Sequence, residues 1–176
     1  MKPAWIVFIL GTAAILIFSW RFSIQARRYH GAARFFAFES ILILFILNAR
    51  FWFQRPFTAA HIFSWLFLLA SIPPVVSGTL LLVRQGRPDG QLENTTRLVT
   101  TGIYHWIRHP LYLSVGLFGT GVFLKNVTLE TSLLAIVVAA AVILTALIEE
   151  GEMKARFGES YGAYMKTTKR FIPGVF

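Results

Sequence analysis

Long uncharged runs are the feature that most restricts how this chain can fold. A run of about 18 apolar residues is long enough to cross the hydrocarbon core of a bilayer as a helix. Two clear runs of this kind lie at 3–20 and at 129–148. The only charged residue of the second run is Glu130, at its outer edge. The chain is 56% hydrophobic, 15% aromatic and only 14% charged. This composition is typical of a helical membrane protein and excludes an ordinary soluble domain.

Three further apolar runs predict a bundle of five spans in one all-α domain that covers residues 1–176. The run 57–83 is too long for one upright helix, and its halves beside Pro73-Pro74 are too short to cross, so we expect one tilted and kinked span. The first run lacks a cleavage pattern and is interpreted as a span rather than a signal peptide. The predicted spans are 3–21, 35–53, 57–83, 110–127 and 129–148.

The basic residues are distributed unevenly along these spans. Thirteen of the 17 Lys and Arg residues fall in the segments that follow the first, third and fifth predicted spans. The positive-inside rule then predicts an outer N-terminus and a cytoplasmic C-terminus. The same bias explains the net charge of +9 without a nucleic-acid partner. Because the spans are short and no targeting segment is visible, we expect a bacterial inner membrane.

The polar side chains with chemical potential gather in two segments, 96–112 and 149–173, which this topology places on one membrane face. Pro110 suits the first turn of a helix, so Arg108-His109 would lie just outside a helix N-terminus, whose free N–H groups suit a carboxylate or hydroxyl of a ligand. Glu149-Glu150 follow the last span directly, and a carboxylate at the bilayer edge needs a cationic partner from the protein or a ligand. We expect Glu152 to pair with Arg156 one turn later.

Two further patterns lie near these segments, one in the run after Pro110 and one in the tail. Small residues in the run that follows Pro110 predict either close helix packing or a groove for a cofactor or a lipid-like tail; these are Ser114, Gly116, Gly119, Thr120 and Gly121. The tail predicts an amphipathic interfacial helix that ends at Gly158, with Phe157, Tyr161 and Tyr164 on one face.

Two sequence motifs carry a family resemblance. Leu98–Tyr112 contains Gly-x-Tyr-x-x-x-Arg-His-Pro-x-Tyr, and Glu149–Pro173 contains Glu-Glu-x-x-Met-x-x-x-Phe-Gly-x-x-Tyr-x-x-Tyr. In this order they resemble the isoprenylcysteine carboxyl methyltransferase family and the related phospholipid methyltransferases, over roughly the C-terminal half of the chain. The resemblance implies a membrane methyltransferase that binds S-adenosylmethionine on the cytosolic side and takes a lipidic or amphiphilic acceptor from the bilayer, without a metal.

The resemblance also implies which residues form the site. The implied catalytic residues are Arg108, His109 and Glu149, and the implied cofactor-binding residues are Thr96, Leu98, Val99, Tyr104, His109, Pro110, Leu111, Tyr112, Glu149 and Glu150. In this scheme Glu149 takes the ammonium group of the cofactor, while the aromatic faces of Tyr104 and Tyr112 lie against its cationic or adenine part.

Position 145 departs from the family pattern. The prenylcysteine enzymes carry a substrate-binding arginine four residues before the first glutamate of the pair, where this chain has Thr145. One interpretation is that another arginine takes that role, either Arg108 or Arg34, with Arg34 held in place by Glu39. The other is that the acceptor is a phospholipid or another small amphiphile that is methylated on N, S or O. Two other interpretations stay open. One is a sterol-reductase-like NADPH enzyme, which the glutamate pair disfavours, and the other is a non-enzymatic membrane scaffold.

Overall fold

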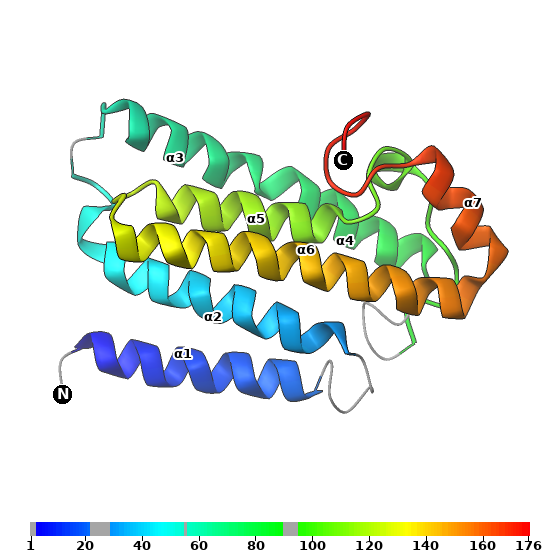
Figure 1. The fold of residues 1–176 in the computed structure, drawn as a ribbon, viewed down its shortest axis with the longest axis horizontal. Helices are drawn as coiled ribbons and strands as arrows, with labels where there is room; N and C mark the ends of the chain where they lie inside the picture. The colour runs from blue at the N-terminus through cyan, green and yellow to red at the C-terminus, as the bar shows by residue number, and fades with distance from the viewer. Residues whose placement is uncertain (1–2, 22–28, 55, 90–94) are drawn as a thin grey trace.

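The computed structural model describes residues 3–21, 29–54, 56–89 and 95–176, which form long helices joined by loops (Figure 1). The predicted all-α class is confirmed, since the pairing of extended backbone in the described residues is limited to two isolated bridges. The helices are α1 (Pro3–Ser19), α2 (His30–Asn48), α3 (Ala59–Ala70), α4 (Ile72–Gln85), α5 (Pro110–Phe123), α6 (Leu129–Phe157) and α7 (Glu159–Thr167), with short 3-10 turns η2 (Ala49–Phe51) and η3 (Gly102–His105).

Three helical runs among the described residues are long and apolar enough to cross a membrane: His30–Phe51, Ala59–Gln85 and Leu129–Phe157. Two further apolar helices, Ala4–Ser19 and Pro110–Phe123, are shorter. These helices indicate a membrane protein. The count of five spans stays a prediction, because length and composition support three of them.

The run 57–83 is divided where its prolines predicted a kink. α3 ends before Ser71, and α4 begins at Ile72 with prolines in its first turn. A proline at that place loses no intrahelical hydrogen bond, because first-turn N–H groups have no partner within the helix. The hydroxyl of Ser71 donates to the carbonyl of Leu68 at 2.6 Å. α4 then continues in the general direction of α3 (Figure 1).

α6 is longer than predicted, since it continues past residue 148 to Phe157. Good helix formers such as Glu, Met, Lys and Ala fill this extension, so nothing in its sequence stops the helix at the membrane boundary. The helix ends at Gly158, whose φ of 57° favours glycine. The predicted helix end at Gly158 is confirmed, but the residues before it continue α6 and do not form a separate tail helix. Tyr161 and Tyr164 lie on α7, a second helix after Gly158.

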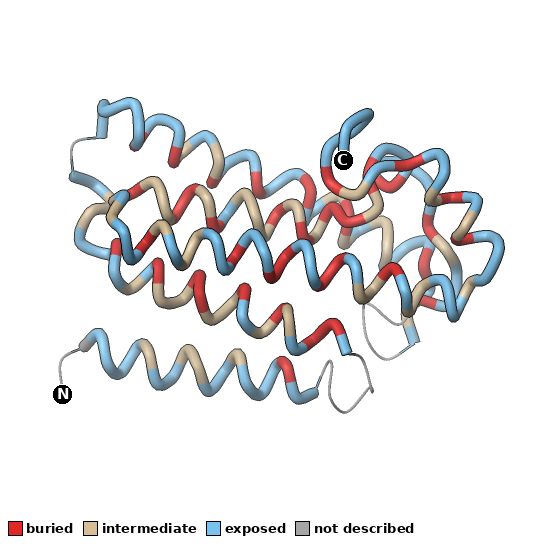
Figure 2. The backbone as a smooth tube through the Cα atoms, in the orientation of Figure 1, coloured by how far each residue is buried: buried red, intermediate tan, exposed pale blue. Residues whose placement is uncertain are grey.

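α6 lies at the centre of the bundle and packs against α2 and α5, while α5 also packs against α3 and α4. α1 packs against α2 and is mostly exposed (Figure 2). The core is apolar and consists of Ala37, Ile41, Leu44, Leu68, Tyr112, Val122, Val138, Ala141, Val142, Ala146 and Phe171. Glycine permits close approach at two positions, because a Cβ on Gly119 would lie 2.9 Å from Val138 and one on Gly121 would lie 2.7 Å from Leu68.

The loop that precedes α5, helix α7 and the C-terminal tail gather at one end of the bundle (Figure 1). The starts of α2 and α5 and the ends of α4 and α6 lie at the same end. This arrangement brings the two polar segments together, as the predicted topology requires.

Candidate functional site

Backbone hydrogen bonds join the two polar segments directly. The N–H of Arg108 donates to the carbonyl of Lys169 at 2.8 Å, and the N–H of His109 donates to the carbonyl of Arg170 at 3.1 Å. Ile107 and Lys169 form an isolated parallel bridge. The residues just before α5 are thus fixed against the residues just after α7.

Glu150 is the centre of a buried ion cluster behind this junction. Its carboxylate accepts hydrogen bonds from Arg108 at 3.0 and 2.9 Å and from Arg170 at 3.1 and 2.8 Å. His109 Nε2 lies 3.3 Å from the same carboxylate. Arg108 also donates to the carbonyl of Thr168. A buried carboxylate needs such partners, and these tie α6, the start of α5 and the tail into one unit.

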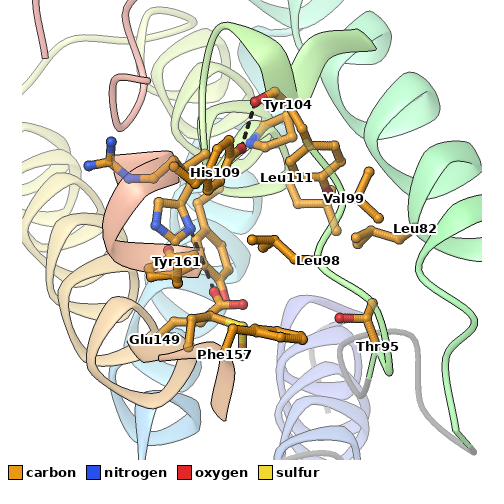
Figure 3. Close-up of a pocket in the computed structure, with 15 residues that line it drawn as sticks. Leu82, Thr95, Leu98, Val99, Tyr104, His109, Leu111, Glu149, Phe157 and Tyr161 are labelled. Carbon is orange, nitrogen blue, oxygen red and sulfur yellow. Dashed lines mark hydrogen bonds and ion pairs between the residues drawn. The ribbon is translucent and has the colours of Figure 1, made fainter. Parts of the chain in front are cut away.

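Glu149 faces the other way, toward a pocket. Its Oε2 lies 3.6 Å from His109 Nδ1, and the hydroxyl of Tyr112 is another hydrogen-bond partner. Figure 3 shows the His109 ring and the Glu149 carboxylate pointing at each other. The ring of Tyr112 stacks on that of His109 at a centroid distance of 5.6 Å. His109 therefore lies between the two glutamates, with one ring nitrogen toward each.

These glutamates set the charge of His109. Burial alone lowers the pKa of an imidazole, but hydrogen bonds and negative charge from Glu149 and Glu150 outweigh it and raise the pKa of His109 above its ordinary value of 6.5. The imidazole therefore stays protonated to higher pH than usual. The two carboxylates therefore favour the protonated form, which has no free lone pair with which to remove a proton from an acceptor.

The pocket encloses about 670 Å³, including space open to solvent. It lies between the loop before α5, the first turn of α5, the last turns of α6 and helix α7 (Figure 3). Its lining consists of Leu82, Thr95, Leu98, Val99, Tyr104, Arg108, His109, Pro110, Leu111, Tyr112, Glu149, Met153, Phe157, Tyr161 and Tyr164. Burial raises the pKa of the Tyr104, Tyr161 and Tyr164 hydroxyls, so these aromatic side chains are neutral.

The start of α5 lies beside this pocket, and Pro110, Leu111 and Tyr112 are part of the lining. α5 begins with Pro110, and no side chain caps it from the N-cap residue His109. The N–H groups in the first turn of an α-helix have no intrahelical partner, and they create a positive end potential. The pocket therefore combines a carboxylate, neutral aromatic faces and a helix N-terminus.

The structure places most of the predicted site residues on this pocket. Those that line it are Leu98, Val99, Tyr104, Arg108, His109, Pro110, Leu111, Tyr112 and Glu149. Thr96 and Glu150 do not. Thr96 is exposed, and its hydroxyl donates to the carbonyl of Arg87 at 2.9 Å, while its neighbour Thr95 is buried and faces the pocket. Glu150 instead belongs to the ion cluster.

The sequence prediction missed six lining residues: Leu82, Thr95, Met153, Phe157, Tyr161 and Tyr164. The last three had a signal, since they were expected on one face of a tail helix. Met153 lies one turn beyond Glu149, and a longer α6 would have indicated it. Leu82 reaches the pocket through the packing of α4, which no local pattern in the sequence reveals.

A second cavity lies between α5 and α6 and encloses about 790 Å³, including open space. Its lining is almost wholly apolar and includes Phe171, Ile172 and Phe176 of the tail. Tyr112 lines both cavities, so this apolar groove between α5 and α6 lies beside the pocket. A Cβ on Gly116 would meet no atom within 4 Å. The predicted close packing is therefore found at Gly119 and Gly121, whereas Gly116 borders open space and a ligand in this groove stays a prediction.

The arginines proposed for an acceptor carboxylate are otherwise engaged. Arg108 lines the pocket, but its guanidinium is held by Glu150. Arg34 is buried over the ring of Phe18 at 5.2 Å and does not line the pocket. Glu39 accepts a hydrogen bond from Thr12 of α1, not from Arg34 as expected. Thr145 is buried, and its hydroxyl donates to the carbonyl of Ala141 at 2.6 Å.

Comparison with known proteins assigns a family to this arrangement. No individual curated protein matches the chain. Among the described residues, no group of three or more His, Asp or Glu side chains is placed to hold a metal ion. The model of the phospholipid methyltransferase family matches residues 59–160, more than half of the chain and most of the pocket. This match confirms the resemblance of the two motifs, and the chain belongs to the phospholipid methyltransferase family.

Proposed function

We propose that this chain is an integral membrane methyltransferase that uses S-adenosylmethionine to methylate a lipidic or amphiphilic acceptor. The observation that carries the proposal is the position of Glu149, a carboxylate in an aromatic-lined pocket beside the N-terminus of α5. Family membership supplies the reaction type. We further infer five spans from the apolar runs, a cytoplasmic C-terminal face from the distribution of Lys and Arg, and a bacterial inner membrane from the short spans.

The residues of the pocket fit the chemical groups of this cofactor. Glu149 would bind its ammonium group, the first turn of α5 would meet its carboxylate, and Tyr104 and Tyr112 offer faces to a cation or an adenine. The cofactor, when bound, supplies an electrophilic methyl group on a sulfonium. The contribution of the chain is to orient the bound molecules and to exclude water, for which Leu98, Val99 and Leu111 provide apolar walls.

The acceptor is proposed to place an apolar chain in the groove between α5 and α6. This groove is apolar and shares Tyr112 with the pocket, so a chain within it would bring its polar head to the pocket. We infer a reaction most like carboxyl methylation of a prenylcysteine. A phospholipid or another small amphiphile methylated on N, S or O is the second candidate, and the engagement of Arg108 by Glu150 favours it, because a carboxylate acceptor needs a cation.

The test is a calorimetric titration of detergent-purified protein with S-adenosylmethionine and, separately, with NADPH. We expect heat with the first ligand and none with the second. Glu149→Ala and His109→Ala should each weaken binding, whereas Glu159→Ala, a change of an exposed carboxylate on α7, should not. A titration in which S-adenosylmethionine gives no heat would overturn the proposal. Wild-type affinity in both site variants would show that the site is misplaced.

Once binding is established, the acceptor can be identified by transfer of a labelled methyl group. Prenylcysteine, amine-bearing phospholipids and single-chain amines should be compared in the same membranes. Methylation of prenylcysteine alone supports carboxyl transfer, and methylation of an amine-bearing lipid supports the second candidate.

A further inference from the structure

Glu152 has a role in the structure that differs from its predicted pairing with Arg156. Its Oε1 accepts hydrogen bonds from the backbone N–H groups of Tyr29 at 3.0 Å and His30 at 3.4 Å, and its Oε2 lies 2.8 Å from His30 Nδ1. An acidic group at a helix N-terminus satisfies donors that have no intrahelical partner. Glu152 therefore fixes the start of α2 to the extension of α6.

The contact between Glu152 and the start of α2 does not require the imidazole of His30. The two backbone N–H groups are satisfied by Glu152 alone, yet the side chain of His30 is completely buried against the same carboxylate. Burial of an imidazole is unfavourable unless its ring nitrogens have partners. The ring restricts the Glu152 carboxylate to one position and places an imidazole on this side of α6.

Glu149 lies within reach of this arrangement. Residues three apart on a helix share a face, so Glu149 and Glu152 project from the same side of α6. The charge of His30 also acts on Glu149. Below the pocket, α2 and α6 pack through core residues that include Ala37 and Val138. A displacement of the start of α2 would therefore move the turn of α6 that carries Glu149.

The neighbouring glutamates differ in how their charge is balanced. Glu150 has ion pairs with Arg108 at 2.9 Å and Arg170 at 2.8 Å. Glu149, within the described residues, pairs with His109 at the longer distance of 3.6 Å. Glu149 is thus the less strongly paired of the two carboxylates and the one that lines the pocket.

We propose that His30, acting through Glu152, is a positioning residue for the Glu149 carboxylate and determines how well Glu149 binds the ammonium group of S-adenosylmethionine. This inference rests on the proposed function. It adds a residue of α2 to the site, from outside the region 59–160 that the family model matches.

The experiment compares two ligands and three variants. Methylthioadenosine shares the adenosine and sulfur of S-adenosylmethionine but has neither ammonium nor carboxylate. His30→Gln and Glu152→Gln remove the ion pair, and Glu159→Gln is the control for loss of an exposed carboxylate. We expect both test variants to bind S-adenosylmethionine about tenfold more weakly, a size common for coupled sites, with unchanged affinity for methylthioadenosine and unchanged binding in the control.

The outcomes separate the two proposals. Equal losses for both ligands would indicate general loosening of the pocket and would overturn the positioning role, as would wild-type affinity in both test variants. If the wild-type protein does not bind S-adenosylmethionine, the proposed function and this inference fall together. If His30→Gln does not fold, Glu152→Gln decides the question, because its amide oxygen can still accept the N–H groups of α2.

Discussion

At the residue scale, His109 makes the stability of the site depend on pH. Its pKa is raised above 6.5 by Glu149 and Glu150, against the effect of burial. A group whose pKa is higher in the folded state stabilises that state fully below its unfolded pKa, and this stabilisation is lost as the pH rises through the folded pKa. The melting temperature of the detergent-purified protein should therefore fall as the pH rises from about 6.5 through the raised pKa.

The matched controls for this prediction are His109→Asn and His105→Asn. His109→Asn should lose the part of the pH dependence that begins near 6.5. The side chain of His105 is exposed and packs against the ring of Trp106. His105→Asn should therefore keep the wild-type dependence of melting temperature on pH. A wild-type profile in His109→Asn would contradict the assignment of this titration to His109.

Glu150 supports a second prediction at the same scale. Glu150→Gln leaves Arg108 and Arg170 without their carboxylate, in a place where Glu150 and Arg108 are largely buried. Loss of one partner in a buried ion pair costs about 3 kcal/mol or more. We expect a clearly lower midpoint in denaturant unfolding, while Lys169→Gln, a change of an exposed side chain in the same tail, should have no such effect. Equal midpoints in the two variants would show that the cluster does not stabilise the tail.

Single residues also show how far sequence reasoning can reach. The positions of Glu149, His109 and Tyr112 were predictable because two motifs and a topology put them at one membrane face. The difference between Glu149 and Glu150 was not, since adjacent residues on a helix point about 100° apart and only the packing decides which one meets the arginines. His30 gave no signal, because its partner Glu152 is distant in the chain.

At the scale of elements, the groove between α5 and α6 gives a test of the acceptor proposal. Gly116→Leu puts a side chain where a Cβ now meets no atom within 4 Å, so it should fill the groove without a clash in the core. We expect transfer to long-chain acceptors to fall about tenfold or more, a usual effect of obstructing an apolar subsite, while affinity for S-adenosylmethionine stays unchanged.

Gly151 is the matched control for this variant. It lies on α6, and a Cβ there also meets no atom within 4 Å, but it does not line the groove. Gly151→Leu should therefore keep wild-type transfer rates. Equal rates for long and short acceptors in Gly116→Leu would argue that the acceptor chain lies elsewhere.

The elements themselves were predicted unevenly. The kink in Ala59–Gln85 followed from two prolines, which act locally and are visible in the sequence. The helix end at Gly158 was predicted, but the continuity of α6 across residue 148 was not, because hydropathy marks where a helix leaves the bilayer and not where it stops. Thr145 shows a related limit. The prenylcysteine enzymes carry arginine at this position, but in this chain the residue is buried inside the bundle, so Thr145→Arg should overpack the core.

At the scale of the whole molecule, the bundle has two unlike ends. The pocket end carries the basic segments that predict a cytoplasmic face. At the other end Lys125 is buried, with its ammonium 3.7 Å from the ring centre of Trp65. α5 has 14 residues, which gives a length of about 21 Å at about 1.5 Å per residue, less than the roughly 30 Å of a bilayer core. α5 would therefore cross only a locally thinned bilayer, and labelling at its two ends tests whether it spans.

The absence of cysteine from the sequence makes that measurement direct, because every introduced thiol is the only one in the chain. Glu159→Cys marks the pocket end, and Val127→Cys, in the exposed turn between α5 and α6, marks the opposite end. A membrane-impermeant maleimide added to intact bacteria should label Val127→Cys, and it should label Glu159→Cys only after the inner membrane is permeabilised. Labelling of both from outside would contradict α6 as a span. The reversed pattern would place the pocket outside the cytoplasm, away from the supply of S-adenosylmethionine that the proposed function requires.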